Sequence, residues 1–141
     1  MADTAPTLKL TSDGAMKVLR AAIGKATDMG VPQCISVVDT GGHLVAFCRM
    51  DGAFVMSNTS SRRKAETAAI YVAPTGDIPE GVDIKLALVT EGQRVNLPGG
   101  LPLIVDGQVV GAIGVGSGTG AQDLEVAKVG VAALEGAQRF D

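Results

Sequence analysis

The sequence contains few aromatic residues, histidines and cysteines. Its 141 residues include no tryptophan, one tyrosine, three phenylalanines, two cysteines and a single histidine, His43. One histidine excludes a metal site built from several imidazoles of one chain, and we predict no metal ligands. With so few aromatics, the core must consist mainly of Ala, Val, Leu and Ile. Their small side chains bury little area each, so we expect contacts between subunits to contribute to stability.

The sequence also shows no long apolar run and no basic region, and its first residues do not have the pattern expected of a secretory signal. No run approaches the ~20 apolar residues that a membrane helix requires. The first ten residues, MADTAPTLKL, have no basic start followed by an apolar stretch. Twelve basic against fifteen acidic residues give a net charge of −3, which disfavours nucleic acid as a partner. We therefore predict a cytoplasmic protein with neither a membrane nor a nucleic-acid partner.

Apolar residues recur at helical spacing in several segments. The first segment begins at Thr11, which is a suitable helix cap, and ends before Gly30, which suits a left-handed stop. The last segment opens on a capping box formed by Thr119 and Gln122. The predicted helices cover residues 11–29, 55–72, 82–91 and 119–134.

Two pairs of β-rich runs predict two hairpins. Those within residues 34–50 flank the glycines at 41–42, and those within residues 101–115 flank the Asp-Gly pair at 106–107. Both faces of these strands are largely apolar, which predicts cover on both sides. The predicted fold class is α+β, with an antiparallel sheet built from two hairpins and flanked by helices on both sides.

Three segments carry a resemblance to a known family: VVDTGGHLVAFCRMDGA at 37–53, SRRKAETAA at 61–69 and NLPGGLPLIVDGQVVGAIGVGSGTGAQDLEVA at 96–127. They resemble the GlcG/HbpS-like family of glycolate-operon accessory proteins, haem-binding proteins and C-terminal domains of propanediol-operon cobalamin adenosyltransferases. The resemblance implies a sheet of about five strands. The first eight residues are small and polar and include Pro6, which predicts a flexible leader at 1–8 before a single domain over residues 9–141. The resemblance also implies homo-oligomers, from dimers to octamers, and haem or a corrinoid as cofactor.

The loop before the second hairpin is the strongest candidate for a binding site. Asn96, Gly99 and Gly100 lie in the run NLPGG, where glycines let backbone N–H groups approach a ligand without an obstructing Cβ. In an enzyme, the same N–H groups would form an oxyanion hole. A tight turn that leads into a strand explains these residues equally well.

Basic residues supply the candidate positive charge. Arg63 and Lys64 lie early in the second predicted helix, and Arg49 ends the first hairpin. Such residues bind the carboxylates of haem propionates and of small organic acids. The structural alternative is a solvated helix face in which Arg62 pairs with Glu66, four residues further on.

His43 and Asp39 lie at the first turn and are the candidate acid/base residues. An imidazole has an ordinary pKa of about 6.5, although hairpin turns often contain such polar residues for structural reasons. Together, the candidates predict a protein that binds a small organic ligand. The resemblance implies that it is an accessory protein of a catabolic pathway, with haem or another tetrapyrrole as leading ligand. The alternative is a small catabolic enzyme that performs acid/base chemistry on a carboxylated or carbonyl metabolite.

Overall fold

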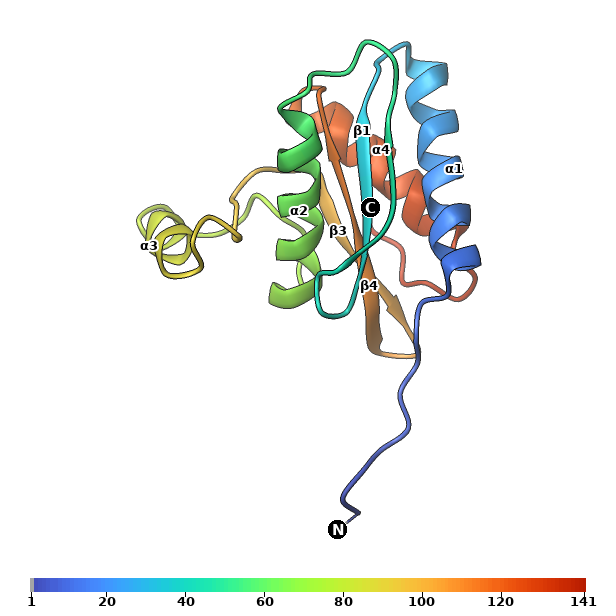
Figure 1. Cartoon of the computed structure of the whole chain (residues 1–141), viewed down its shortest axis with the longest axis vertical. Coiled ribbons are helices and arrows are strands. Elements are labelled where there is room, and N and C mark those ends of the chain that lie inside the picture. The colour runs from blue at the N-terminus through green and yellow to red at the C-terminus, as the bar shows by residue number, and fades with distance from the viewer. Residues whose placement is uncertain (1) are drawn as a thin grey trace.

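The computed structural model describes residues 2–141, which form one antiparallel sheet with helices on both of its faces (Figure 1). The elements follow the predicted order of helix, hairpin, helices, hairpin and helix, so the α+β class is confirmed. Their bounds are α1 Ser12–Met29, β1 Cys34–Asp39, β2 Leu44–Arg49, α2 Ser57–Tyr71, α3 Val82–Val89, β3 Gly100–Val105, β4 Gln108–Gly116 and α4 Gly120–Ala133. No helix among residues 2–141 combines the length and the apolar character needed to cross a membrane.

The sheet has four strands in the order β2-β1-β4-β3. Each hairpin supplies two neighbouring strands, and antiparallel pairing of β1 with β4 joins the hairpins, so that Val37 lies opposite both Ala46 and Ile113. The prediction of about five strands is corrected to four within the described residues. The chain between the hairpins forms helices and loops, and beyond β3 the C-terminal segment adds one isolated bridge, from Val105 to Ala137.

Helices cover the two faces of the sheet unequally. α1 and α4 pack on the face that carries Ile35 and Leu101, and with it they enclose the main core. α2 lies on the opposite face, where Ala65 belongs to a smaller cluster with Val38. The approach of α2 is close, because a Cβ on Gly114 would collide with the α2 backbone. This close contact fixes α2, and the polar residues of its first turns, against the end of β4.

The predicted helix ends are confirmed by their local contacts. The Thr11 side chain accepts a hydrogen bond from the Gly14 N–H at 3.0 Å, and Gly30 ends α1 in the left-handed region at φ 69°. At α4, the Gln122 N–H donates to the Thr119 hydroxyl at 3.2 Å. The Gln122 side-chain carbonyl accepts from the Thr119 N–H at 2.9 Å, which completes the capping box.

Two elements are less covered than the sequence predicts. β2 is an edge strand, and its apolar residues Leu44 and Phe47 are exposed. α3 projects from the body on two long connections (Figure 1), and none of its residues is buried. Leu88 and Val89 on this helix are 73% and 75% exposed. Apart from Asp83 and Lys85, every residue of α3 is apolar, although a helix so rich in apolar residues is normally covered.

Candidate functional site

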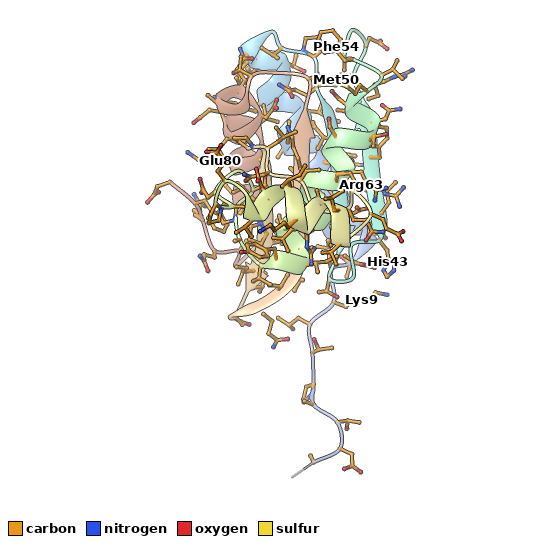
Figure 2. All side chains as sticks on the ribbon, turned by 90° about the vertical axis from the view of Figure 1, so that its left-hand side faces the viewer. Lys9, His43, Met50, Phe54, Arg63 and Glu80 are labelled. Carbon is orange, nitrogen blue, oxygen red and sulfur yellow. The ribbon has the colours of Figure 1, made fainter. Side chains whose placement is uncertain are left out.

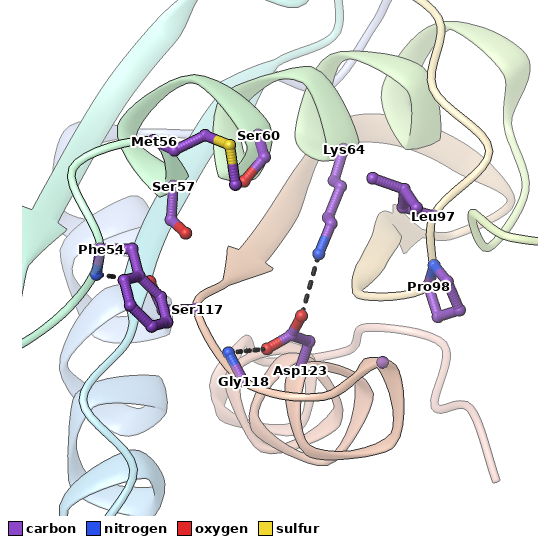
Figure 3. Close-up of a pocket in the computed structure, with 11 residues that line it drawn as sticks. Phe54, Met56, Ser57, Ser60, Lys64, Leu97, Pro98, Ser117, Gly118 and Asp123 are labelled. Atoms are coloured by element: carbon purple, nitrogen blue, oxygen red, sulfur yellow. Dashed lines mark hydrogen bonds and ion pairs between the residues drawn. The ribbon is translucent and has the colours of Figure 1, made fainter.

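A cavity of about 350 Å³ opens between the first turns of α2 and the loop that leads into α4 (Figure 3). Its volume lies near the lower end of the range of small-molecule sites, ~300–1,000 Å³. The segment before α2 and the loop before β3 complete its wall. The lining residues are Phe54, Met56, Ser57, Ser60, Lys64, Leu97, Pro98, Ser117, Gly118, Gly120 and Asp123.

The floor of this cavity, which we call the Lys64 pocket, holds a buried ion pair. Lys64 Nζ, from α2, lies 2.9 Å from Asp123 Oδ2, in the first turns of α4. The same ammonium donates to the Val115 carbonyl oxygen at 2.8 Å. Only 6% and 4% of the Lys64 and Asp123 side chains are exposed. The pair therefore links α2, β4 and α4 where the pocket meets the core.

The second oxygen of Asp123 is held by two further donors. The Gly118 backbone N–H donates to Oδ1 at 2.9 Å. Gln33, fully buried just before β1, donates an amide N–H to the same oxygen at 2.9 Å and another to the Gly116 carbonyl oxygen, in the amide orientation that satisfies both partners. Both carboxylate oxygens are thus engaged by the protein, as a buried carboxylate requires.

The walls of the pocket combine hydroxyl groups with exposed apolar side chains. At the rim, the exposed fractions of Phe54, Met56 and Leu97 are 68%, 76% and 51%. The Phe54 backbone N–H donates to the Ser117 hydroxyl at 3.0 Å, which ties the rim to the loop before α4. Apolar rims over polar floors are typical of sites for organic molecules that carry a polar group. Three hydroxyl side chains line the pocket, those of Ser57, Ser60 and Ser117.

Of the ligand contacts predicted from the sequence, Lys64 lines this pocket. Gly99 and Gly100 lie beside Lys64, where they are closely packed against other parts of the chain. A Cβ on Gly99 would lie 2.7 Å from the Val115 carbonyl oxygen and 3.2 Å from Lys64 Nζ. The Gly100 N–H donates to the Thr75 hydroxyl at 2.8 Å. The two glycines therefore let β3 approach α2 and β4, and the Gly100 amide already has a partner within the chain.

Asn96 bridges the two connections that carry α3. Its Oδ1 accepts from the Ile78 N–H at 2.9 Å, while its Nδ2 donates to the Ile78 carbonyl oxygen at 2.8 Å and to Asp83 Oδ2 at 3.2 Å. Hydrogen bonds from Asn96 and from the Ile84 N–H hold the pKa of Asp83 below its ordinary value. The structure therefore places Asn96 at the base of α3, outside the pocket lining.

The predicted arginines lie in different environments. Arg63 donates to Glu66 Oε2 at 2.7 Å and Arg62 donates to Oε1 at 3.1 Å, so the expected Arg62–Glu66 pair is confirmed. Both guanidinium groups balance one carboxylate whose side chain is nearly buried. Arg49 is exposed at the end of β2, opposite Cys34. It lies at the same end of the sheet as the pocket.

His43 and Asp39 form a turn remote from the Lys64 pocket. Asp39 Oδ1 accepts from the Gly41 and His43 backbone N–H groups at 2.9 and 3.0 Å, and His43 Nδ1 lies 3.1 Å from it. Partial desolvation raises the pKa of Asp39, but the His43 and Gly41 hydrogen bonds outweigh it and hold the pKa below its ordinary value. Figure 2 shows His43 and Phe54 at opposite ends of the domain. The structure does not bring the candidate acid/base residues to the pocket.

A buried thiol lies behind the Phe54 wall. Cys34 Sγ lies 3.6 Å from the Phe54 carbonyl oxygen. Burial raises the pKa of the Cys34 thiol, and a hydrogen bond with Ser117 and the charge of Arg49 offset this only in part. The neutral thiol is therefore favoured over the thiolate. Across residues 2–141, no three His, Cys, Asp or Glu side chains cluster as metal ligands do.

Sequence reasoning missed Asp123 and Gln33, on which the pocket floor depends. A signal for Asp123 was present: it shares the buried face of α4 with Val126, Ala127 and Gly130, three, four and seven residues further on. A carboxylate on a buried face requires a partner. For Gln33 there is no comparable local signal, because its burial results from the packing of the α4 loop over the start of β1.

A comparison with known families decides the relationship. The model of the family described as "Haem degrading protein HbpS-like" matches residues 10–132. This chain belongs to the HbpS-like family. The resemblance seen in the sequence is thereby confirmed.

Proteins similar to this HbpS-like chain match almost its whole length. An uncharacterized 15.0 kDa protein of the dhaT-dhaS intergenic region of Citrobacter freundii is 40% identical over 124 residues, 84% of this chain and 87% of that protein. The crystal structure of Klebsiella pneumoniae protein ORFY superimposes with a TM-score of 0.90 at 32% identity, covering 98% of this chain and 99% of that one. A crystal structure of a PduOC:heme complex superimposes with a TM-score of 0.86 at 27% identity, covering 95% and 100% of the two chains.

Proposed function

We propose that this HbpS-like chain is an accessory protein of a catabolic pathway that binds a small organic ligand in the Lys64 pocket, with haem or another tetrapyrrole, such as a corrinoid, as the leading ligand. The pocket itself carries the proposal, because an apolar rim surrounds a floor that holds the buried Lys64–Asp123 ion pair. The family's description and the PduOC:heme complex support a tetrapyrrole.

The pocket residues fit the edge of a tetrapyrrole. Phe54 and Leu97 provide exposed apolar surface for the macrocycle, and the Lys64 ammonium provides an N–H group for a charge-assisted hydrogen bond to a propionate. Met56 brings a thioether, a recognised class of haem-iron ligand, to the rim. Bound haem would supply a redox-active iron, while the chain would orient the macrocycle. Arg49, exposed at the same end of the sheet, would be a second cationic contact for the ligand.

The proposal includes assembly into homo-oligomers, from dimers to octamers. Exposed apolar side chains on α3 and at the rim support it, because single chains rarely leave so many contiguous apolar residues uncovered. It also includes a cytoplasmic location, which the two free cysteines, Cys34 and Cys48, support.

Ligand binding is favoured over acid/base catalysis by the placement of the candidate residues. His43 and Asp39 lie at a turn, and Gly100 lies two strands away in the sheet and three residues along it. At about 4.8 Å per strand and 3.3 Å per residue, these groups are more than ~10 Å apart. One small metabolite does not span that distance while it reacts.

Titration of the full chain with haem tests the proposal. We expect a shifted Soret band that saturates, and at least about tenfold weaker binding in Phe54→Asp and Leu97→Asp, because each places a charge on the apolar rim. His43→Ala is the matched control and should bind as the wild type does. The absence of a saturable Soret shift, or its loss in His43→Ala alone, would contradict the proposal.

A further inference from the structure

We propose that the floor of the Lys64 pocket is a carboxylate site, in which Lys64 and the hydroxyls of Ser57 and Ser60 bind a carboxylate group of the ligand. The proposal rests on the proposed function, since it concerns the same pocket, and it names the chemical group that the pocket recognises. It also makes Lys64 the anchor of the site, while Asp123 positions Lys64.

The ammonium group of Lys64 has one donor left for a ligand. An ammonium carries three N–H groups, and Nζ has two acceptors among residues 2–141, the Val115 carbonyl oxygen and Asp123 Oδ2. The side chain is 6% exposed, and it lines the pocket (Figure 3). A buried N–H without an acceptor is costly. A ligand oxygen in the pocket would therefore gain a charge-assisted hydrogen bond.

Asp123 does not compete for that ligand. Its Oδ2 accepts from Lys64, and its Oδ1 accepts from the Gly118 N–H and the Gln33 amide. The carboxylate is thus saturated by protein donors, and its charge is balanced by the adjacent ammonium. The floor presents hydrogen-bond donors to the cavity, so the fitting ligand group is an acceptor.

The neighbouring hydroxyls complete a site for two oxygen atoms. Ser57, Ser60 and Lys64 stand at positions i, i+3 and i+7 of α2, so they share one face of the helix. All three line the pocket, and a hydroxyl rotates to donate to whatever acceptor is present. Gly118 and Gly120, at the start of α4, line the facing wall, where the helix dipole favours negative charge. A carboxylate uses both groups, with one oxygen on Lys64 and the other on a serine.

The apolar rim of the pocket indicates which kind of molecule carries the carboxylate. Phe54, Met56 and Leu97 surround the entrance with exposed apolar surface, so the body of the ligand is apolar. Two sources share this chemistry: the propionate of a tetrapyrrole, and a free monocarboxylic acid with an apolar body. The probes below distinguish them.

Calorimetric titrations of the full chain with benzoate and with benzamide test the site directly. The two probes have nearly the same shape, but only benzoate carries the charge. We expect benzoate to bind at least about tenfold more tightly, because only benzoate pairs a charge with the ammonium, and because benzamide presents an NH2 group where benzoate has its second acceptor oxygen. The second probe pair is haem and haem dimethyl ester, whose propionates are blocked. If propionates occupy the floor, the ester should bind at least about tenfold more weakly.

Variants of α2 distinguish direct binding by Lys64 and the two serines from a general effect of positive charge on the helix. Ser57→Ala combined with Ser60→Ala keeps the ion pair and should weaken benzoate binding several-fold. Lys64→Met combined with Asp123→Leu removes both charges together and should abolish the preference for benzoate over benzamide. Arg63→Met removes a neighbouring cation of α2 that contacts Glu66 instead of the pocket, and it should bind as the wild type does.

The outcomes separate this inference from the proposed function. If benzoate binds through Lys64 and haem does not bind, the carboxylate site stands and the tetrapyrrole proposal falls. If haem binds, but benzoate shows no preference over benzamide and haem dimethyl ester binds as tightly as haem, the proposed function stands and the carboxylate site is refuted. Equal benzoate binding by the wild type and the Lys64→Met, Asp123→Leu variant also refutes it.

Discussion

Lys64 and Asp123 are 59 residues apart in the chain, yet Nζ and Oδ2 meet at 2.9 Å in the floor of the pocket. The contact joins α2, which lies on one face of the sheet, to α4, which packs on the other. It is made at the end of β4, where Lys64 also donates to the Val115 carbonyl oxygen. One ion pair thus holds the two layers together and lines the pocket between them.

Breaking this pair should cost more than removing it. Lys64→Met leaves the Asp123 carboxylate buried without its cation, which typically costs about 3–5 kcal/mol. Lys64→Met combined with Asp123→Leu buries no charge and should lose less than the single variant. Urea unfolding of the wild type, of Lys64→Met, of Asp123→Leu and of the double variant measures the four free energies of unfolding that this comparison needs. A double variant as unstable as the sum of its single variants would show that the charges do not depend on each other.

Replacing two glycines by alanine should have opposite effects on stability, because only Gly114 lies where α2 packs closely on β4. A Cβ on Gly114 would collide with the backbone of Ser61 and Ala65, so Gly114→Ala should destabilise the domain by at least about 2–3 kcal/mol. Gly24 lies in α1 with nothing within 4 Å of an added Cβ. Gly24→Ala should therefore stabilise the domain by about 0.5–1 kcal/mol. Thermal unfolding of both variants tests this, and a neutral Gly114→Ala would refute the close contact.

The elements that sequence analysis predicted correctly depend on local contacts. Thr11 caps α1, and Thr119 with Gln122 caps α4, through residues at most three positions apart. The short turn after β1 fixes its register, so Val37 lies opposite Ala46. Such signals are present in any short window of the sequence.

The pocket could not be predicted in the same way, because its residues meet only in the folded chain. Lys64 appears within a basic run, and nothing near it in the sequence distinguishes it from Arg63, which contacts Glu66. In the sequence, Gly99 is equally compatible with ligand binding and with close packing. Which of the two applies depends on the groups that face Gly99 in the folded chain. In the structure, the Val115 carbonyl oxygen and the Lys64 ammonium lie there.

The turn at Asp39 should make stability depend on acid pH. Hydrogen bonds hold the folded pKa of Asp39 below its unfolded value, which is near 3.8. Its contribution is therefore fully present above that value and disappears as pH falls through the lower folded pKa. Asp39→Asn should be less stable than the wild type at pH 7, and the difference should shrink by pH 3. Asp3→Asn, in the exposed N-terminal stretch, is the control and should be as stable as the wild type at both pH values. If the stability difference between the wild type and Asp39→Asn did not change with pH, the assignment would be contradicted.

The two thiols should differ in reactivity. Cys34 is fully buried and burial raises the pKa of its thiol, whereas Cys48 is partly exposed. Iodoacetamide at pH 8 should therefore modify Cys48 first and leave Cys34 protected in the native chain. Peptide mass spectrometry assigns the sites, and unfolding in guanidinium should make both react. Rapid native labelling of Cys34 would show that the wall behind Phe54 opens.

The exposed α3 predicts a defined effect on assembly. Leu88→Lys places a charge on the exposed apolar surface of α3, so a homo-oligomer that covers α3 should dissociate at low micromolar concentration. Lys85→Ala changes the same helix without adding a charge and should leave the assembly intact. Light scattering after size exclusion measures the mass. An unchanged mass in Leu88→Lys would place the subunit interface elsewhere.

The central claim is that the Lys64 pocket holds the ligand, and a crystal structure of the wild-type chain grown with haem tests it most directly. The account predicts a macrocycle against Phe54, Met56 and Leu97, with a propionate within hydrogen-bond distance of Lys64 Nζ. Haem bound at the His43 turn or along α1, with the Lys64 pocket empty, would contradict it.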